Sequence, residues 1–297
     1  MATQVSDIFL HPSHLRRNWR EMFPPCELPD CRTGHNAWSR LWHRRRGVRM
    51  HNTWYCSAEC FESGAAQAFA EMLARIAEQS PVKHRVPLGL VMISRGQLSP
   101  QHLRVALEAQ RVAGRGKLGY WLKELGFSTQ QQVTSSLALQ WASPVFALRS
   151  TFVPGCARIL PLPLLESFRM LPVHYVAATH ALYIGFAEKI DYVMLSGIEQ
   201  ILDCRTRPCI VNPEALEKIL EQLRQRPRSG EIQFHARIEP EEMARITREY
   251  ATKLGAEEVR SIVCGEYLWL RLVGGRSATS LLFRRTLKEG SPAGIRG

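Results

Sequence analysis

The chain has 297 residues, which leaves room for more than one domain because a single hydrophobic core seldom grows to this length. Hydrophobic residues make up 45% and charged residues 22%, a composition typical of globular proteins that argues against disorder throughout the chain. The formal net charge of +12 favours anionic partners such as nucleotides, nucleic acid or a lipid surface, without choosing among them.

The first residues carry no positive cluster followed by an apolar stretch, so no secretory signal is predicted. No apolar run approaches the roughly 18 residues that a membrane-spanning helix needs. We therefore expect a cytoplasmic protein without a membrane span. In that compartment the eight cysteines are more often thiols or metal ligands than disulfides.

Two close pairs of cysteines lie in the N-terminal part of the chain, Cys26 with Cys31 and Cys56 with Cys60. Two such pairs can converge on one tetrahedral zinc ion. We therefore predict a structural zinc bound by these four thiolates. The remaining cysteines have no paired spacing and are expected in the core: Cys156, Cys204, Cys209 and Cys264.

The second pair lies in the segment Trp54–Phe61, which resembles the zinc knuckles of treble-clef-like modules. Three residues separate its cysteines, whereas many knuckles use two. A helix is expected to follow, around Ala65 to Glu78, and a helix start stabilises the thiolate form that zinc needs. A histidine could replace one cysteine as a ligand, and the candidates are His35, His43 and His51.

A basic and aromatic segment lies between the two cysteine pairs, made of Trp38, Arg40, Trp42, His43, Arg44, Arg45, Arg46 and Arg49. Such a segment could contact nucleic-acid phosphates or an acidic partner. A solvated surface loop is the simpler interpretation, so nucleic-acid binding is kept as an alternative.

An internal repeat is the strongest pattern in the sequence, because Pro87–Gln110 and Lys117–Gln140 match at an offset of 30 residues. The identical pairs are Leu88 and Leu118, Gly89 and Gly119, Gly96 and Gly126, Gln101 and Gln131, Leu107 and Leu137, and Gln110 and Gln140. The repeat predicts two copies of one helical hairpin.

In each copy a short helix should end at a glycine in the left-handed conformation, Gly96 or Gly126. The next helix should be capped by Ser99 or Thr129. Its buried stripe is predicted to be Leu103 and Leu107 in the first copy and Val133 and Leu137 in the second.

The repeated pattern resembles the MshEN domain, the N-terminal region of the bacterial secretion ATPase GspE and the pilus ATPase MshE. The resemblance continues from Pro161 to about Leu223, where that family has an αβ subdomain. The family's tandem motifs bind cyclic di-GMP, so the resemblance implies the same ligand. It implies contacts from Leu88, Gly89, Met92, Gly96, Leu103, Leu107, Gln110, Lys117, Leu118, Gly119, Leu122, Gly126, Val133, Leu137 and Gln140.

The first position of the motif is an arginine in that family, but Pro87 and Lys117 stand there in this chain. Lysine lacks the planar fork of arginine, and proline carries no charge. Arg85 lies close enough in sequence to compensate for Pro87.

Beyond the repeat, strands and helices alternate. The expected elements are a hairpin over Val173–Ala187, a helix over Asp191–Leu202, a strand over Pro208–Val211 and a helix over Pro213–Leu223 with Asn212 as its cap. A boundary is expected at Gln225–Gly230. The C-terminal elements are a strand at Ile232–His235, a helix at Pro240–Leu254 and strands at Val259–Cys264, Tyr267–Val273 and Ser280–Arg284.

The predicted fold class is α+β. Residues 1–83 form the zinc-knuckle module and its helix, and residues 84–225 form the MshEN-like domain, with helical motifs 87–110 and 117–140 and an αβ subdomain over 142–225. A small C-terminal αβ module covers 231–288, and residues 289–297 are expected to be a disordered tail.

The chain carries no Gly-x4-Gly-Lys-Ser/Thr phosphate loop, and the glycine-rich stretch Val273–Ser280 is interpreted as a hairpin loop. We therefore expect no enzymatic activity. The leading hypothesis is a sensor or adaptor that binds cyclic di-GMP and docks on secretion or pilus machinery. The alternatives are a protein-interaction module that has lost the nucleotide and a zinc-containing nucleic-acid-binding protein.

Overall fold

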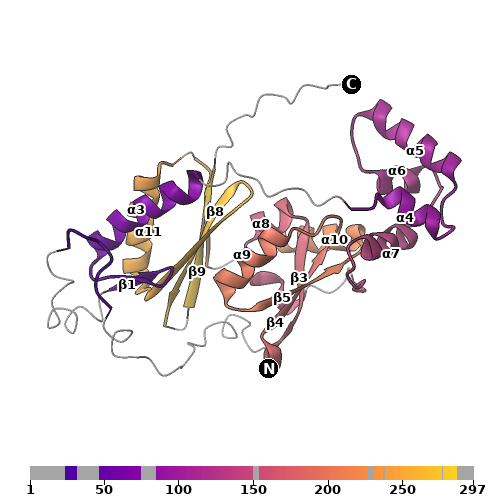
Figure 1. Ribbon diagram of the computed structural model, residues 1–297. Helices are drawn as coiled ribbons and strands as arrows, with labels where there is room; N and C mark the ends of the chain where they lie inside the picture. Colours follow the sequence, from indigo (N-terminus) through magenta and orange to yellow (C-terminus); the bar gives the residue numbers. More distant parts are fainter. Residues whose placement is uncertain are drawn as a thin grey trace. The chain divides into compact units, whose positions relative to one another are not determined.

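The computed structural model describes residues 24–31, 47–74, 85–149, 154–225, 230–236, 238–275 and 277–285. The chain divides into two compact units. The first comprises Met1–Gln79, Ser196–Asp203 and Arg228–Gly297, and the second comprises Ser80–Leu195 and Cys204–Pro227. Both units combine helices with strands, so the predicted α+β class is confirmed (Figure 1).

Among its described residues, the first unit contains a six-stranded sheet with the order β2-β1-β7-β8-β9-β6. Its strands are β1 (Val48–Met50), β2 (Thr53–Tyr55), β6 (Glu231–Phe234), β7 (Glu258–Cys264), β8 (Tyr267–Gly274) and β9 (Ser277–Arg284). The pairs β1 with β7 and β6 with β9 are parallel, and the other neighbours are antiparallel.

The pairing of β1 with β7 joins two segments that are predicted to belong to different modules, the N-terminal one and the C-terminal one. Arg49 lies opposite Glu258, and Met50 lies opposite Val259. A short hairpin such as β1 and β2 is only marginally stable in water, so it gains most of its stability from a neighbouring strand. No local sequence signal specifies that neighbour.

Two helices cover one face of this sheet, α3 (Ala58–Ala74) and α11 (Pro240–Leu254), and they lie side by side. Their buried side chains meet those of the central strands in one core, to which Phe61, Phe69, Met243, Leu268 and Leu270 contribute. The bounds of α11 are those predicted. The helix α3 begins before the predicted Ala65, and residues 75–84, where its predicted end falls, lie outside the described residues.

The second unit contains, in its described part, a three-stranded sheet with the order β3-β4-β5. The strands β3 (Met170–Val176) and β4 (Ala181–Phe186) form the predicted hairpin, and β5 (Arg205–Ile210) is parallel to β4. The helices here are α8 (Leu162–Ser167), α9 (Tyr192–Leu202), which contributes residues to both units, and α10 (Pro213–Arg224). Asn212 caps α10 as predicted, accepting hydrogen bonds from two backbone amides.

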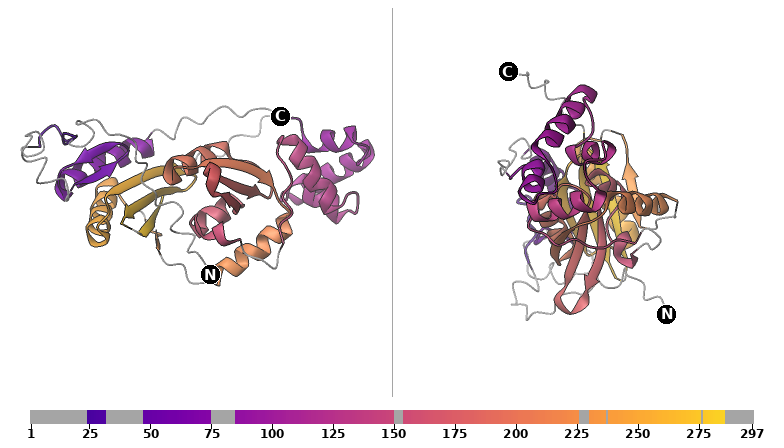
Figure 2. Two further views of the ribbon diagram at one scale, coloured as in Figure 1. Left: turned by 90° about the horizontal axis from the view of Figure 1, so that it is seen from below. Right: turned by 90° about the vertical axis from the view of Figure 1, so that its right-hand side faces the viewer.

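The internal repeat folds as two helical hairpins, which gather into one bundle (Figure 2). The first copy forms α4 (Leu88–Ser94) and α5 (Pro100–Ala113), and the second forms α6 (Leu118–Glu124) and α7 (Gln130–Gln140). Gly96 and Gly126 have φ angles of 67° and 71°, and Ser99 and Thr129 cap the longer helices. These four predictions are confirmed.

The hairpins pack across the repeat, because α4 lies against α7 and α5 lies against α6. Met92, Leu98, Ala106, Leu122 and Val133 form the core between them. Each copy of the bundle is therefore completed by the other copy.

One expectation about the buried stripes is wrong. Leu107 is 45% exposed, and Ala106 is fully buried in its place. The stripe of α5 runs from Leu103 to the residue three positions later instead of four. These two positions lie on opposite sides of Leu103 around the helix, about 60° and 40° away from it, so either can extend the stripe. Leu103 and Leu137 are half-buried, and Val133 is buried.

No helix among the described residues is both long and apolar enough to cross a membrane.

Replacing Leu122 by alanine should lower the free energy of unfolding by about 2–5 kcal/mol, because the fully buried side chain leaves a cavity between the two copies. Leu139, which is 57% exposed in the same bundle, is the matched control, and Leu139→Ala should change the free energy by less than about 0.5 kcal/mol. Urea unfolding followed by tryptophan fluorescence measures both. Equal effects of the two substitutions would contradict the assigned core.

Candidate functional site

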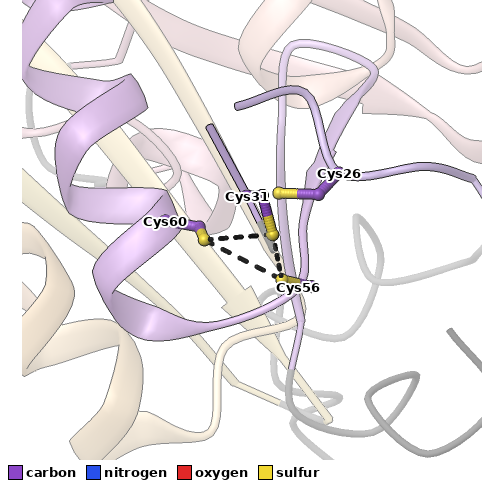
Figure 3. A group of neighbouring side chains, drawn as sticks. All are labelled: Cys26, Cys31, Cys56 and Cys60. Atoms are coloured by element: carbon purple, nitrogen blue, oxygen red, sulfur yellow. Dashed lines mark hydrogen bonds between the residues drawn. The ribbon is translucent and has the colours of Figure 1, made fainter. Parts of the chain in front are cut away.

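The four cysteines predicted to bind zinc come together in the first unit (Figure 3). Cys26 and Cys31 lie in the described segment before β1, Cys56 follows β2, and Cys60 lies in the first turn of α3. A backbone hydrogen bond of 3.1 Å from Glu27 to β2 holds the first segment in place. The cluster thus connects a loop, a strand and a helix.

The sulfur atoms of the four cysteines all lie within 4.8 Å of one another. The Sγ of Cys31 lies 3.4 Å from that of Cys56 and 3.7 Å from that of Cys60, and the last two are 3.8 Å apart. A disulfide needs about 2.05 Å between its sulfur atoms. Four thiolates placed about 2.3 Å from one zinc ion would be ~3.8 Å apart, so the observed spacing fits a tetrahedral metal site.

The surroundings of Cys60 combine burial with the start of a helix. Its backbone N–H donates a hydrogen bond of 3.2 Å to the Oγ of Ser57, which caps the first turn of α3. Burial raises the pKa of the Cys60 thiol, so the uncharged form is favoured as long as no cation is bound. Metal binding requires the thiolate and would release this proton.

Of the histidines offered as alternative ligands, His51 is the one that the structure describes, and it is not part of the cluster. His51 lies at the turn between β1 and β2, where its Nε2 is 2.5 Å from the Oγ of Ser261, and burial lowers its pKa. His35, His43 and the predicted basic segment, apart from Arg49 in β1, lie outside the described residues.

The cysteines without paired spacing are buried, as predicted. Burial raises the pKa of Cys156 to about 11 and that of Cys209 to about 12. These two thiols therefore stay uncharged at neutral pH, which suits core residues.

In the repeat, the last glutamine of each copy holds the segment that precedes the other copy. The Nε2 of Gln110 donates a hydrogen bond of 2.9 Å to the backbone oxygen of Gly116. The Nε2 of Gln140 donates one of 2.7 Å to the backbone oxygen of Val86. Gly116 and Val86 are themselves 30 residues apart, so the two contacts are equivalent under the repeat.

Each held segment begins with an arginine, Arg85 in one copy and Arg115 in the other. The guanidinium of Arg85 lies 3.8 Å from the ring centroid of Trp141, 5.7 Å from that of Tyr192, and donates a 3.3 Å hydrogen bond to the backbone oxygen of Gln140. Arg115 is exposed. The two arginines match at the repeat offset of 30 residues, a signal that is visible in the sequence.

The residues implied by the motif resemblance divide into a scaffold and a surface. The buried members are Gly89, Met92, Leu122 and Val133, whose atoms build the packing between helices. The half-buried members are Leu88, Leu103, Gln110, Leu118, Gly119, Leu137 and Gln140, and the exposed ones are Gly96, Leu107, Lys117 and Gly126. The amide donors of the two glutamines serve the backbone contacts described above.

Replacing Gln140 by glutamate should destabilise the repeat by about 1–2 kcal/mol, because a carboxylate accepts hydrogen bonds only and would face the Val86 oxygen without a donor. Gln131, which is exposed on the same helix, provides the matched substitution Gln131→Glu. Thermal unfolding of both variants at neutral pH measures the difference. An equal melting temperature for the two would show that the contact contributes nothing.

No protein-family model matches this chain, and neither does any curated protein. Solved structures do match part of it. The structure of MshE with cdg is 26% identical over 46% of this chain and 99% of that one, with a TM-score of 0.37. The N-terminal domain of XpsE is 16% identical in two crystal forms, which cover 48% and 47% of this chain and 98% of the domain with TM-scores of 0.34 and 0.27. These TM-scores are low, so the likeness alone assigns neither a fold nor a function to this chain.

Proposed function

We propose that the tandem repeat binds a cyclic dinucleotide, cyclic di-GMP by the resemblance of its motif, and that the chain is a non-catalytic regulator or adaptor of secretion or pilus machinery. The observation that carries this proposal is the exchange of contacts between the copies. Gln110 and Gln140 hold equivalent backbone atoms at Gly116 and Val86, so two equivalent segments are presented.

A cyclic dinucleotide has two equivalent halves, each with one phosphate and one base. Two equivalent protein segments can each contact one half. Arg85 and Arg115 supply a cation to each segment, and a guanidinium binds phosphate through charge-assisted hydrogen bonds. The half-buried Leu88 and Leu118, three residues after each arginine, offer apolar contacts for the bases.

The side chains proposed to contact the nucleotide are guanidinium, amide and apolar groups, together with Lys117. None of these pairs a nucleophile with a general base in the described structure, which is the arrangement that covalent catalysis uses. The role proposed for the repeat is therefore binding without turnover.

For the cysteine cluster, the proposed ligand is a structural zinc ion. Support comes from the spacing of the sulfur atoms and from the absence of any other donor type among the described cluster residues. A bound zinc would link the loop of Cys26 and Cys31 to β2 and α3. The link would stabilise the edge of the sheet to which β1 and β2 belong.

A second candidate function, docking of a protein partner, is favoured by the exposed face of α5. Val105 and Val112 are 49% and 77% exposed on this face. They line a shallow groove of about 720 Å³ together with Ala109 and Trp121. Exposed apolar side chains grouped on one helix often mark a protein interface, and this face could serve an adaptor whether or not the nucleotide binds.

Isothermal titration should show binding of cyclic di-GMP by the full chain. Arg85→Gln and Arg115→Gln should each weaken it by about tenfold, because each removes one charge-assisted contact. Arg95→Gln, at the other end of α4, is the control and should bind as the wild type does. The affinity should fall as salt is added.

The absence of any heat at high micromolar ligand would overturn nucleotide binding and leave the protein-docking candidate. Binding that Arg85→Gln and Arg115→Gln leave unchanged would instead place the ligand elsewhere in the chain.

Purified protein should contain about one equivalent of zinc, since the four cysteines complete one tetrahedral site. Cys56→Ser should lose the metal and melt at a lower temperature, because three ligands hold zinc less tightly. Cys209→Ser, which also places a hydroxyl at a buried cysteine, should keep the metal. Elemental analysis and thermal melting with and without a chelator measure these effects. Less than about half an equivalent of zinc in the wild type would defeat the proposal.

A further inference from the structure

Two cations of the second unit converge on one carboxylate, that of Glu188, which follows β4. The Nζ of Lys117 forms an ion pair with one oxygen of Glu188. The Nε of Arg169 lies 3.9 Å from the other oxygen. Lys117 occupies the first position of the second motif, so the carboxylate lies at one end of the repeat.

Arg169 is held in an unusual way. Its φ angle is 45°, a conformation that is costly for a residue other than glycine and is kept where the surroundings impose it. One guanidinium nitrogen donates a 3.2 Å hydrogen bond to Glu217. Its Nε is buried and makes no hydrogen bond to any described residue. At 3.9 Å the Glu188 oxygen is too far to accept one.

The arrangement therefore leaves one N–H donor unsatisfied beside a carboxylate that is already shared with Lys117. A phosphate has more acceptor oxygens than a carboxylate and could accept hydrogen bonds from both cations at once. Since Lys117 and Arg169 cannot bind Glu188 and a ligand phosphate in the same position, the two anions would compete.

We propose that Lys117 and Arg169 form a binding site for one phosphate of the dinucleotide, and that Glu188 occupies this site as an internal competitor until the ligand displaces it. This inference rests on the proposed nucleotide binding. In this arrangement Glu188 lowers the affinity for the ligand. Lys117, the residue at the family's arginine position, binds the phosphate together with Arg169.

The ion pairs around Glu188 continue into the αβ part of the same unit. Arg169 also pairs with Glu217 of α10, and Arg224 of α10 pairs with both Glu217 and Glu166 of α8. Displacement of Glu188 would free Arg169 to shift toward the phosphate. The ligand would then change the contacts of α10 without touching that helix.

The test compares affinities for cyclic di-GMP by isothermal titration on the full chain. Glu188→Gln should bind about threefold tighter than the wild type, the factor expected for removing the competition of one partly exposed ion pair. Glu214 provides the matched control because it pairs with Lys123 at 2.9 Å in the same unit, away from the motif position. Glu214→Gln should bind as the wild type does.

The double variant Lys117→Gln with Glu188→Gln separates competition from a general change in charge. If Glu188 acts by occupying Lys117, its replacement should give no tighter binding once Lys117 is gone. An equal gain in both backgrounds, or in Glu214→Gln, would overturn the inference. So would a wild type that binds as tightly as Glu188→Gln, although nucleotide binding itself would then stand. If neither the wild type nor Glu188→Gln binds, both the proposed function and this inference fail.

Discussion

The repeat depends on two close contacts, each between the second residue of a short helix and a side chain of the longer helix in the same copy. A Cβ at Gly89 would lie 2.6 Å from Leu103, and one at Gly119 would lie 2.8 Å from Val133, distances that force a neighbour to move. Because the two contacts are equivalent, the two hairpins share one geometry. The glutamine bridges to the opposite copy, and with them the paired placement of Arg85 and Arg115, follow from this shared geometry.

The sequence could predict features that depend on neighbouring residues. A glycine that ends a short helix, such as Gly126, and a capping side chain, such as Thr129 or Asn212, satisfy hydrogen-bonding groups of the nearby backbone. All three residues have their predicted roles in the structure. The sequence could not predict that β1 joins β7, since the neighbour of a short hairpin is chosen by tertiary packing. Nor could it separate Leu107 from Ala106, since the positions three and four residues after Leu103 flank it on the helix and either can extend its buried stripe.

The candidate sites also divide into features that spacing along the chain predicts and features that only tertiary packing decides. The cysteine cluster could be predicted because its members lie in two close pairs, and convergence on one point needs only that the pairs meet. The pairing of Lys117 with Glu188 spans 71 residues and joins the start of α6 to the segment after β4, and no spacing rule predicts it. The place of Lys117 in the motif predicts that it is a ligand residue. Because the Glu188 carboxylate already pairs with Lys117, the same residue would also control how readily another anion binds there.

The parallel pairing of β1 with β7 also has a consequence for the order in which the chain folds. The paired residues are about 200 positions apart, and the whole second unit lies between them in sequence. During synthesis the second unit can fold once Pro227 has left the ribosome, while β1 and β2 still lack a neighbour. Over that interval their open edge can pair with another nascent chain. A metal ion captured early by the cysteines would hold the N-terminal segment in a native-like form until the last strands arrive.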